Sequence, residues 1–146
     1  MRTAITLTVT TPLAVAVSDT AVRSIRAEDA SGGFGLLPGH ADFLTVLGAS
    51  VLRWRGAGSD WHYCALRGGV LQMRGGTTVD VACREAVPGR DLASLEVLVQ
   101  QAIEDELDAA RQARAEQTRL HTTAIRSLIR HLGTAAPGSD LAGNFR

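Results

Sequence analysis

Gly33-Phe34-Gly35-Leu36-Leu37-Pro38-Gly39-His40 is the stretch of the sequence that decides the fold. Glycine reaches backbone angles that other residues avoid and proline fixes its own φ, so the octapeptide predicts a short strand running into a constrained loop. His40 then ends the loop with a titratable side chain. An active-site loop and a docking loop both fit this pattern, and the rest of the chain has to decide between them.

Short runs of alternating apolar and polar residues surround this loop up to about residue 88. Ile5, Leu7 and Val9, for example, alternate with threonines. Many short strands separated by glycine-rich turns, with no helical periodicity between them, are typical of a sandwich or barrel. The expected strand runs are 5–10, 15–17, 22–25, 34–37, 43–47, 50–55, 61–66, 70–74 and 77–82, with turns at 31–33, 38–39, 48, 56–58, 68–69 and 75–76.

The pattern becomes helical after Pro88-Gly89. Asp91 is a credible N-cap, and apolar residues recur at helical spacing from Leu92 to Leu132. Gln117-Thr118 is only a weak break, so a helical hairpin and one long bent helix are both compatible with the sequence. Gly133 is expected to stop the helix. The expected organisation is an α+β chain with a β domain over 1–88, helices over 89–132 and a disordered tail over 133–146.

Composition excludes several classes of function. The 146 residues are 45% apolar, which is enough for a core, whereas 4% aromatic residues do not make a base-stacking platform. Fifteen basic residues, all arginine, balance fifteen acidic ones, so no nucleic-acid partner is expected. The N-terminus alternates apolar residues with threonine, unlike a signal peptide, and no apolar run is long enough to span a membrane. We expect a cytosolic protein whose Cys64 and Cys83 are reduced, buried and without metal.

Nothing in the sequence supports catalysis. No two of the four histidines have metal-ligand spacing, so no metal site is expected. His40 and Asp42 could form an acid–base pair, but no nucleophile, phosphate loop or second carboxylate accompanies them. A loop histidine that packs at an interface is the simpler interpretation. A cupin enzyme would need a second histidine close to Pro38-Gly39-His40 and a later glutamate and histidine, and these are absent.

Three blocks of the sequence together resemble the ε subunit of bacterial F-type ATP synthases. Gly33–Thr45 is similar to the family's G-x-[LF]-G-[IL]-x-P-G-H-A-x-[LF]-[LF]-T stretch. Gly68–Met73 is similar to its G-G-[FIV]-[LV]-x-[VI] hairpin strand, and Thr77–Ala82 followed by Glu85-Ala86 is similar to its last strand and exit. The resemblance covers nearly the whole chain and implies an antiparallel β-sandwich followed by a C-terminal helical hairpin. One departure is Gly33, which stands where family members often carry an acidic residue.

The resemblance also implies a function and its partners. The chain would be a non-catalytic subunit of the rotor's central stalk, peripheral on the cytoplasmic face of the inner membrane as part of the F1 sector. It would contact the γ subunit and the polar loops of the c-ring. The alternative is a stand-alone β-sandwich interaction module with a helical tail. The residues expected at the rotor interface are Gly33, Phe34, Gly35, Leu36, Leu37, Pro38, Gly39, His40 and Thr45.

The charge of the helical segment is polarised. Residues 91–108 contain six acidic residues and no arginine, whereas residues 109–132 contain five arginines and one glutamate. The two halves could pair with each other, or the basic half could pair with an acidic surface elsewhere. The resemblance implies that such helices contact the α and β subunits and restrain ATP hydrolysis. A regulatory role is therefore the hypothesis for the arginines of the basic half, Arg111, Arg114, Arg119, Arg126 and Arg130.

No cofactor is expected. Several members of the family that the chain resembles bind ATP through an [IL]-D-x-x-R-A motif near the start of the first helix. In this chain the corresponding stretch is Asp91–Glu96, which contains no arginine.

Overall fold

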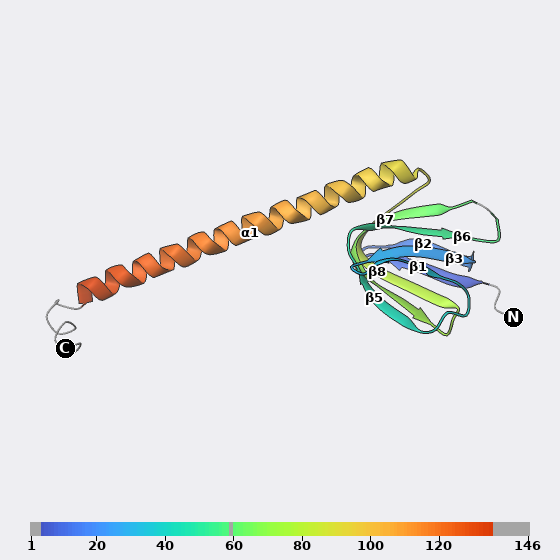
Figure 1. The fold of residues 1–146 in the computed structure, drawn as a ribbon, viewed down its shortest axis with the longest axis horizontal. Coiled ribbons are helices and arrows are strands. Elements are labelled where there is room, and N and C mark those ends of the chain that lie inside the picture. Colours follow the sequence, from blue (N-terminus) through green and yellow to red (C-terminus); the bar gives the residue numbers. More distant parts are fainter. Residues whose placement is uncertain (1–3, 59, 136–146) are drawn as a thin grey trace. The chain divides into compact units, whose positions relative to one another are not determined.

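The computed structural model describes residues 4–58 and 60–135 and contains eight strands and one helix (Figure 1). Residues up to Glu104 form one compact unit, and residues from Asp105 onward form a second. The expected disorder of the tail falls mostly on residues 136–146, which lie outside the described residues. The elements are β1 (Ile5–Thr10), β2 (Val15–Val22), β3 (Ser24–Asp29), β4 (Gly32–Leu36), β5 (Phe43–Leu47), β6 (Ser50–Arg55), β7 (His62–Arg74), β8 (Thr78–Gly89) and α1 (Leu92–Ala135).

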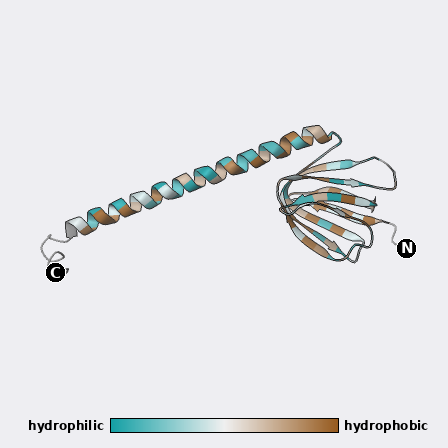
Figure 2. Ribbon diagram, viewed as in Figure 1, coloured by the Kyte–Doolittle hydropathy of each residue, from teal (hydrophilic) through white to brown (hydrophobic). Residues whose placement is uncertain are grey.

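The long β7–β8 hairpin joins the two layers of a β-sandwich. The first half of β7 pairs with β6, and its second half pairs with β5. The first half of β8 pairs with β1. The strand order is β2-β1-β8-β7-β6-β3-β4, with β5 paired to β7 away from this path. The expected β-sandwich is therefore confirmed, and apolar and polar residues alternate along its strands (Figure 2).

Several details of the β domain differ from the sequence-based expectation. The expected strand at 22–25 spans the break at Arg23 between β2 and β3, and the expected turn at 31–33 overlaps the start of β4. The β1–β8 pair is parallel, so the sandwich is not wholly antiparallel. The expected turn at Gly68-Gly69 is also wrong, because both residues lie inside the 13-residue strand β7. Gly68 has a φ of +60°, and a side chain on Gly69 would meet the backbone of Ala82 and Cys83 on the facing strand. These glycines permit a bend and a close approach within one strand.

A single hydrophobic core lies between the layers. Ile5, Leu7, Leu52, Leu71 and Val79 are among its fully buried side chains. They occupy alternate positions of their strands, as expected for a sheet with one buried face.

Cys64 and Cys83 are buried in this core as free thiols, which confirms that they act as small apolar residues. Burial raises the pKa of the Cys64 thiol to about 12, with a further contribution from Cys83. Thiolates are the reactive form of cysteine, so neither side chain is suited to nucleophilic chemistry in the folded protein.

The C-terminal segment is one 44-residue helix, which settles the alternatives of hairpin and single helix in favour of the latter. Asp91 caps it as expected: its Oδ1 accepts a hydrogen bond from the Ala93 amide at 3.3 Å, and its Oδ2 accepts one from the Ser94 hydroxyl. Gln117-Thr118 does not break the helix, because neither residue removes a backbone donor or forces a turn. Gly133 does not stop it either, and the helix ends at Ala135.

The start of α1 packs on the sandwich within the first unit. Leu95 is buried, and the edge of its side chain lies against Gly89. Glu96 forms an ion pair with Arg53 of β6 at 3.6 Å. Residues 92–104 therefore belong structurally to the β domain, although the sequence places them in the helical segment. In the described part of the chain, no helical segment is both long enough and apolar enough to cross a membrane.

The close approach at Gly69 predicts a large effect of a very small substitution. Gly69→Ala adds a Cβ that would lie 2.8 Å from Cys83 Cβ, so we expect a loss of roughly 1–3 kcal/mol in the free energy of unfolding. Gly48→Ala is the matched control, because its Cβ would meet nothing within 4 Å, and its effect should stay within about 0.5 kcal/mol. Urea unfolding followed by Trp54 fluorescence measures both. Equal effects of the two substitutions would contradict the packing described for β7.

Candidate functional site

The loop between β4 and β5 is held against the tight turn between β7 and β8. The Gly39 amide donates a hydrogen bond to the Gly76 carbonyl at 2.8 Å. Both glycines have positive φ, +88° and +70°, and a Cβ on Gly76 would lie only 2.7 Å from the Cα of Gly39. Glycine is needed at both positions, because an L side chain would be strained at either φ, and at Gly76 its Cβ would also collide with Gly39. The Pro38-Gly39 signal in the sequence therefore marks a loop that is fixed by a second turn.

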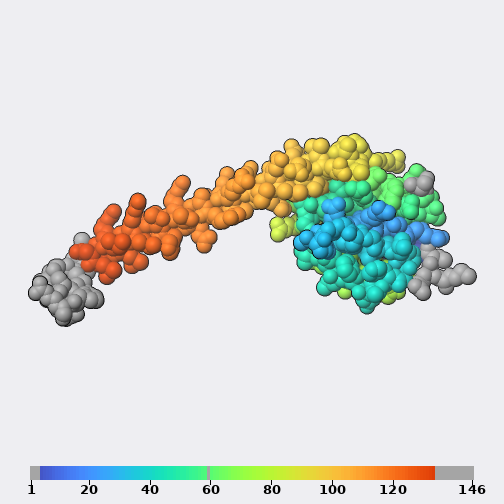
Figure 3. Space-filling view, viewed as in Figure 1, coloured from blue at the N-terminus to red at the C-terminus, as the bar shows by residue number. Residues whose placement is uncertain are grey.

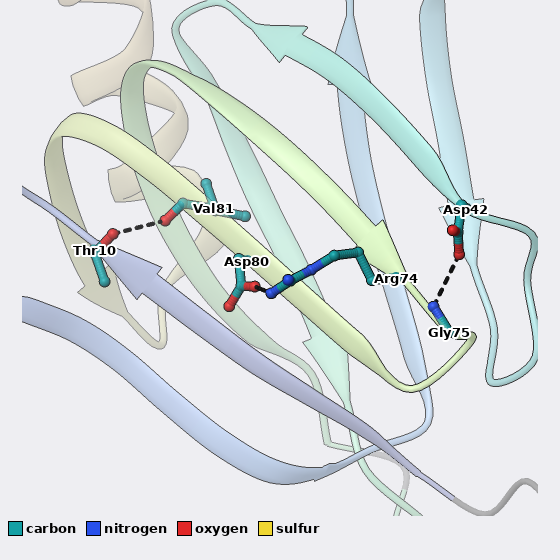
Figure 4. Close-up of polar contacts among 6 residues, drawn as sticks. All are labelled: Thr10, Asp42, Arg74, Gly75, Asp80 and Val81. Atoms are coloured by element: carbon teal, nitrogen blue, oxygen red, sulfur yellow. Dashed lines mark hydrogen bonds and ion pairs between the residues drawn. The ribbon is translucent and has the colours of Figure 1, made fainter.

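A side chain adds a second link between the same two turns. Asp42 Oδ1 accepts a hydrogen bond from the Gly75 amide at 2.9 Å (Figure 4). On the neighbouring strands the Arg74 guanidinium forms an ion pair with Asp80 at 2.8 Å, which crosses the β7–β8 hairpin just beyond its turn. Asp42 is thus a structural residue of the loop and not the partner of His40.

Asp29, at the end of β3, holds the middle of β5. Its Oδ2 accepts a hydrogen bond from the Thr45 hydroxyl at 2.7 Å, and its Oδ1 accepts bonds from the Ser31 hydroxyl and amide. These hydrogen bonds lower the pKa of the Asp29 carboxyl, and the bond from the Ser31 hydroxyl has the largest effect. A carboxylate that accepts several hydrogen bonds prefers its charged form. Thr45 was predicted at the rotor interface from the sequence, whereas no local sequence signal indicated such a role for Asp29.

Ring contacts complete the loop. The rings of Phe34 and Phe43 meet edge to face with centroids 5.2 Å apart, and His40 lies 6.0 Å from Phe43. His40 Nδ1 lies 2.8 Å from the Ala41 carbonyl, so one ring nitrogen serves the backbone of the loop. Among the described residues no group of three His, Cys, Asp or Glu side chains could hold a metal ion. The arrangement fixes a shape and offers no pair of groups for proton transfer.

Exposed apolar side chains lie beside the braced loop. Leu44 and Val46 of β5 are 66% and 70% exposed, and Val46 pairs with the exposed Val70 of β7. Leu37 of the loop is also exposed. We call these four residues the β5 patch. The alternation of β5 could have indicated it, because Leu44 and Val46 stand on the face opposite to the buried Leu47.

The residues predicted at the rotor interface fall into three groups by their exposure. Gly33, Gly35, Leu37 and His40 are exposed, and Phe34, Pro38, Gly39 and Thr45 are partly buried. Leu36 is 1% exposed and belongs to the core, so it is not available to a partner. The segment from β3 to β5, coloured blue to cyan, covers much of the face of the β domain that is turned to the viewer (Figure 3).

The second unit, which begins at Asp105, carries the five arginines for which a regulatory role was predicted. Arg111, Arg114, Arg119, Arg126 and Arg130 are all exposed. Arg111 forms an ion pair with Asp108 one turn earlier, at 3.3 Å. Four apolar side chains of the same helix, Leu120, Leu128, Ile129 and Leu132, are each more than 60% exposed. Exposed apolar residues at helical spacing are typical of a helix that packs against another surface.

Comparison with known proteins identifies relatives of both parts of the chain. Residues 4–89 match the model of the family described as ATP synthase, Delta/Epsilon chain, beta-sandwich domain. The chain is 61% identical over 139 residues to a protein of Cereibacter sphaeroides named ATP synthase epsilon chain 2, covering 95% of this chain and 94% of the relative. A protein of the same name from Paraburkholderia xenovorans is 49% identical over 132 residues, covering 90% of this chain and 95% of the relative.

A solved structure shares the fold at low sequence identity. A chain of the Euglena gracilis mitochondrial ATP synthase, determined as an OSCP/F1/c-ring assembly, superposes with a TM-score of 0.57 and 22% identity. The match covers 74% of this chain and 81% of that chain.

The lowered pKa of Asp29 predicts a pH-dependent stability. A carboxyl with a depressed folded pKa contributes stability above its unfolded pKa, near 3.8, and the contribution is lost as the pH falls through the folded pKa. Asp29→Asn should therefore destabilise the protein at pH 7, and the difference from wild type should shrink below about pH 4. Urea unfolding at several pH values measures this difference.

Thr45→Val is the companion variant, because it removes one donor and should raise the pKa of Asp29. Carboxyl NMR of the folded chain reads this pKa directly. An Asp29 that titrates at its ordinary value in wild type would contradict the hydrogen-bonded arrangement.

Proposed function

The chain belongs to the delta/epsilon family of ATP synthases, as an ε chain of the F-type enzyme, and from this premise we propose that it is a non-catalytic subunit of the enzyme's central stalk. In this role it passes torque between the ion-driven c-ring and the γ subunit at the cytoplasmic face of the inner membrane. Such a role needs a rigid body with a fitted surface. The observation that carries the proposal is the β5 patch beside a loop that two hydrogen bonds tie to the β7–β8 turn.

The β5 patch is the proposed contact with γ. Three of its side chains lie on adjacent paired strands, and apolar side chains of this size contribute to binding mainly through the surface they remove from water. The loop residues Leu37 and His40 continue the same surface toward the polar loops of the c-ring. Rigidity reduces the entropy lost on docking, which favours a braced loop over a mobile one.

The α1 helix is the proposed regulatory element. Its five exposed arginines and its exposed apolar residues suit contact with acidic and apolar surfaces of the α and β subunits. Restraint of ATP hydrolysis by this contact is the second part of the proposal. We propose no ATP site in the helix, because the stretch Asp91–Glu96, which corresponds to the family's motif, contains no arginine.

Co-purification with γ tests the first part. Leu44→Asp combined with Val46→Asp places two charges in the β5 patch and should weaken capture of γ roughly tenfold or more. Val87→Asp is the control. Val87 is an exposed valine near the end of β8, where it pairs with Ala65 of β7 and lies outside the β5 patch. If wild type fails to bring down co-expressed γ, the stalk proposal is wrong and a stand-alone interaction module remains.

Deletion of residues 105–146 tests the second part. The remaining chain keeps Leu95 and the packing of the first helical turns, so assembly should be preserved. ATP hydrolysis by the assembled enzyme should rise, because the basic helix is gone. Replacing the five arginines by glutamine in the full chain should give the same direction of change with the helix still present. Unchanged hydrolysis in both enzymes would refute the inhibitory role.

A further inference from the structure

Three arginines and two aromatic residues gather on the outer face of the layer formed by β3, β6 and β7. Arg26 of β3 stands directly opposite Arg53 of β6, and Arg53 stands opposite Tyr63 of β7. Arg55 lies two residues along β6 on the same face. Together with Trp61 these residues line a cavity of about 350 Å³.

The positive charge of this cavity is poorly compensated. Like charges directly opposite each other on neighbouring strands destabilise a sheet, yet Arg26 and Arg53 are such a pair. Among the described residues Arg26 and Arg55 form no ion pair, and their guanidinium groups lie 5.5 Å and 4.9 Å from the centre of the Trp61 ring. Within the described part of the chain Arg53 forms one ion pair, with Glu96 at 3.6 Å, and both side chains are substantially exposed.

We propose that this cavity binds the phosphate groups of a small soluble phosphorylated ligand. Guanidinium groups present forked donors that match phosphate oxygens, and three of them converge here. Trp61 holds two of the three by ring contacts, which keeps them in place without neutralising their charge. Tyr63 adds a hydroxyl to the lining.

A second cavity, next to the first, is the proposed binding place for the part of the ligand that carries no phosphate. It has a volume of about 410 Å³, shares Arg26 and Arg53 with the first, and is lined also by Gly33, Gly35 and Val51. Neither glycine has a positive φ, and a Cβ at either position would make only ordinary contacts. Their missing side chains therefore leave space on this face without being needed by the backbone.

Carboxylates define which end of the cavity takes the anion. Glu28 lines the second cavity, so the phosphate groups belong on the arginine side. Glu96 competes with the ligand for Arg53, and its exposed ion pair is weak enough to be displaced. Asp60, which precedes Trp61, is exposed and is not among the residues that line the arginine cavity. The site requires neither γ nor the c-ring, so its test does not depend on the proposed role in the stalk.

An NMR titration of the full chain with inorganic pyrophosphate tests the proposal. The Trp61 indole signal should shift and saturate with a Kd on the order of 1 mM or below, while the buried Trp54 indole, bonded to Asp19, serves as an internal control. Arg26→Gln and Arg55→Gln should each weaken binding about tenfold. Arg84→Gln, an exposed arginine of β8, should not.

A second pair of variants separates a site from general charge. Glu96→Gln frees Arg53 and should tighten binding of pyrophosphate, whereas Glu85→Gln, which breaks the similar exposed pair with Arg67, should leave it unchanged. A lack of saturation, or equal weakening by Arg84→Gln, would overturn the proposal. Binding to phosphatidylglycerol vesicles without any response to pyrophosphate would also overturn it, in favour of a lipid headgroup.

Discussion

The contact between Gly39 and Gly76 is the constraint on which the proposed docking surface depends. It joins two turns that are far apart in the sequence, and each glycine has a backbone conformation that other residues rarely adopt. Asp42 strengthens the same junction by accepting the Gly75 amide, and Asp29 fixes the next strand through Thr45. The surface around Leu37, Leu44 and Val46 is therefore presented by a framework that is ordered before any partner arrives.

The β7–β8 hairpin supplies that framework. It pairs with β6 and β5 along one edge and with β1 along the other. Both layers of the sandwich therefore contain parts of the same two strands. The bend at Gly68-Gly69 lets one pair of strands serve both layers. One layer then carries the β5 patch, and the other carries the arginine cavity with the start of α1 beside it.

Sequence reasoning predicted the β-sandwich and most of its strands, because alternation and glycine-rich turns are local signals, but it misplaced the boundary between β2 and β3. It mistook Gly68-Gly69 for a turn, since only the facing strand reveals that the glycines allow a close approach. It could not find Asp29 or the Arg26–Arg53 pair, because these depend on strand register between distant segments. It placed Leu36 on the surface, although its position in β4 buries it. The choice between a hairpin and one helix stayed open because Gln117-Thr118 carries no strong signal.

Native-state hydrogen exchange of the Gly39 and Gly75 amides tests most directly whether the loop is braced in the free chain. Each amide donates across the junction, to the Gly76 carbonyl and to Asp42 respectively. If the loop is braced, both amides exchange slowly. Their opening free energy is then close to that of the amides within the β7–β8 hairpin. Exchange of both amides at the rate of an unstructured peptide, with the hairpin still protected, would contradict a braced loop.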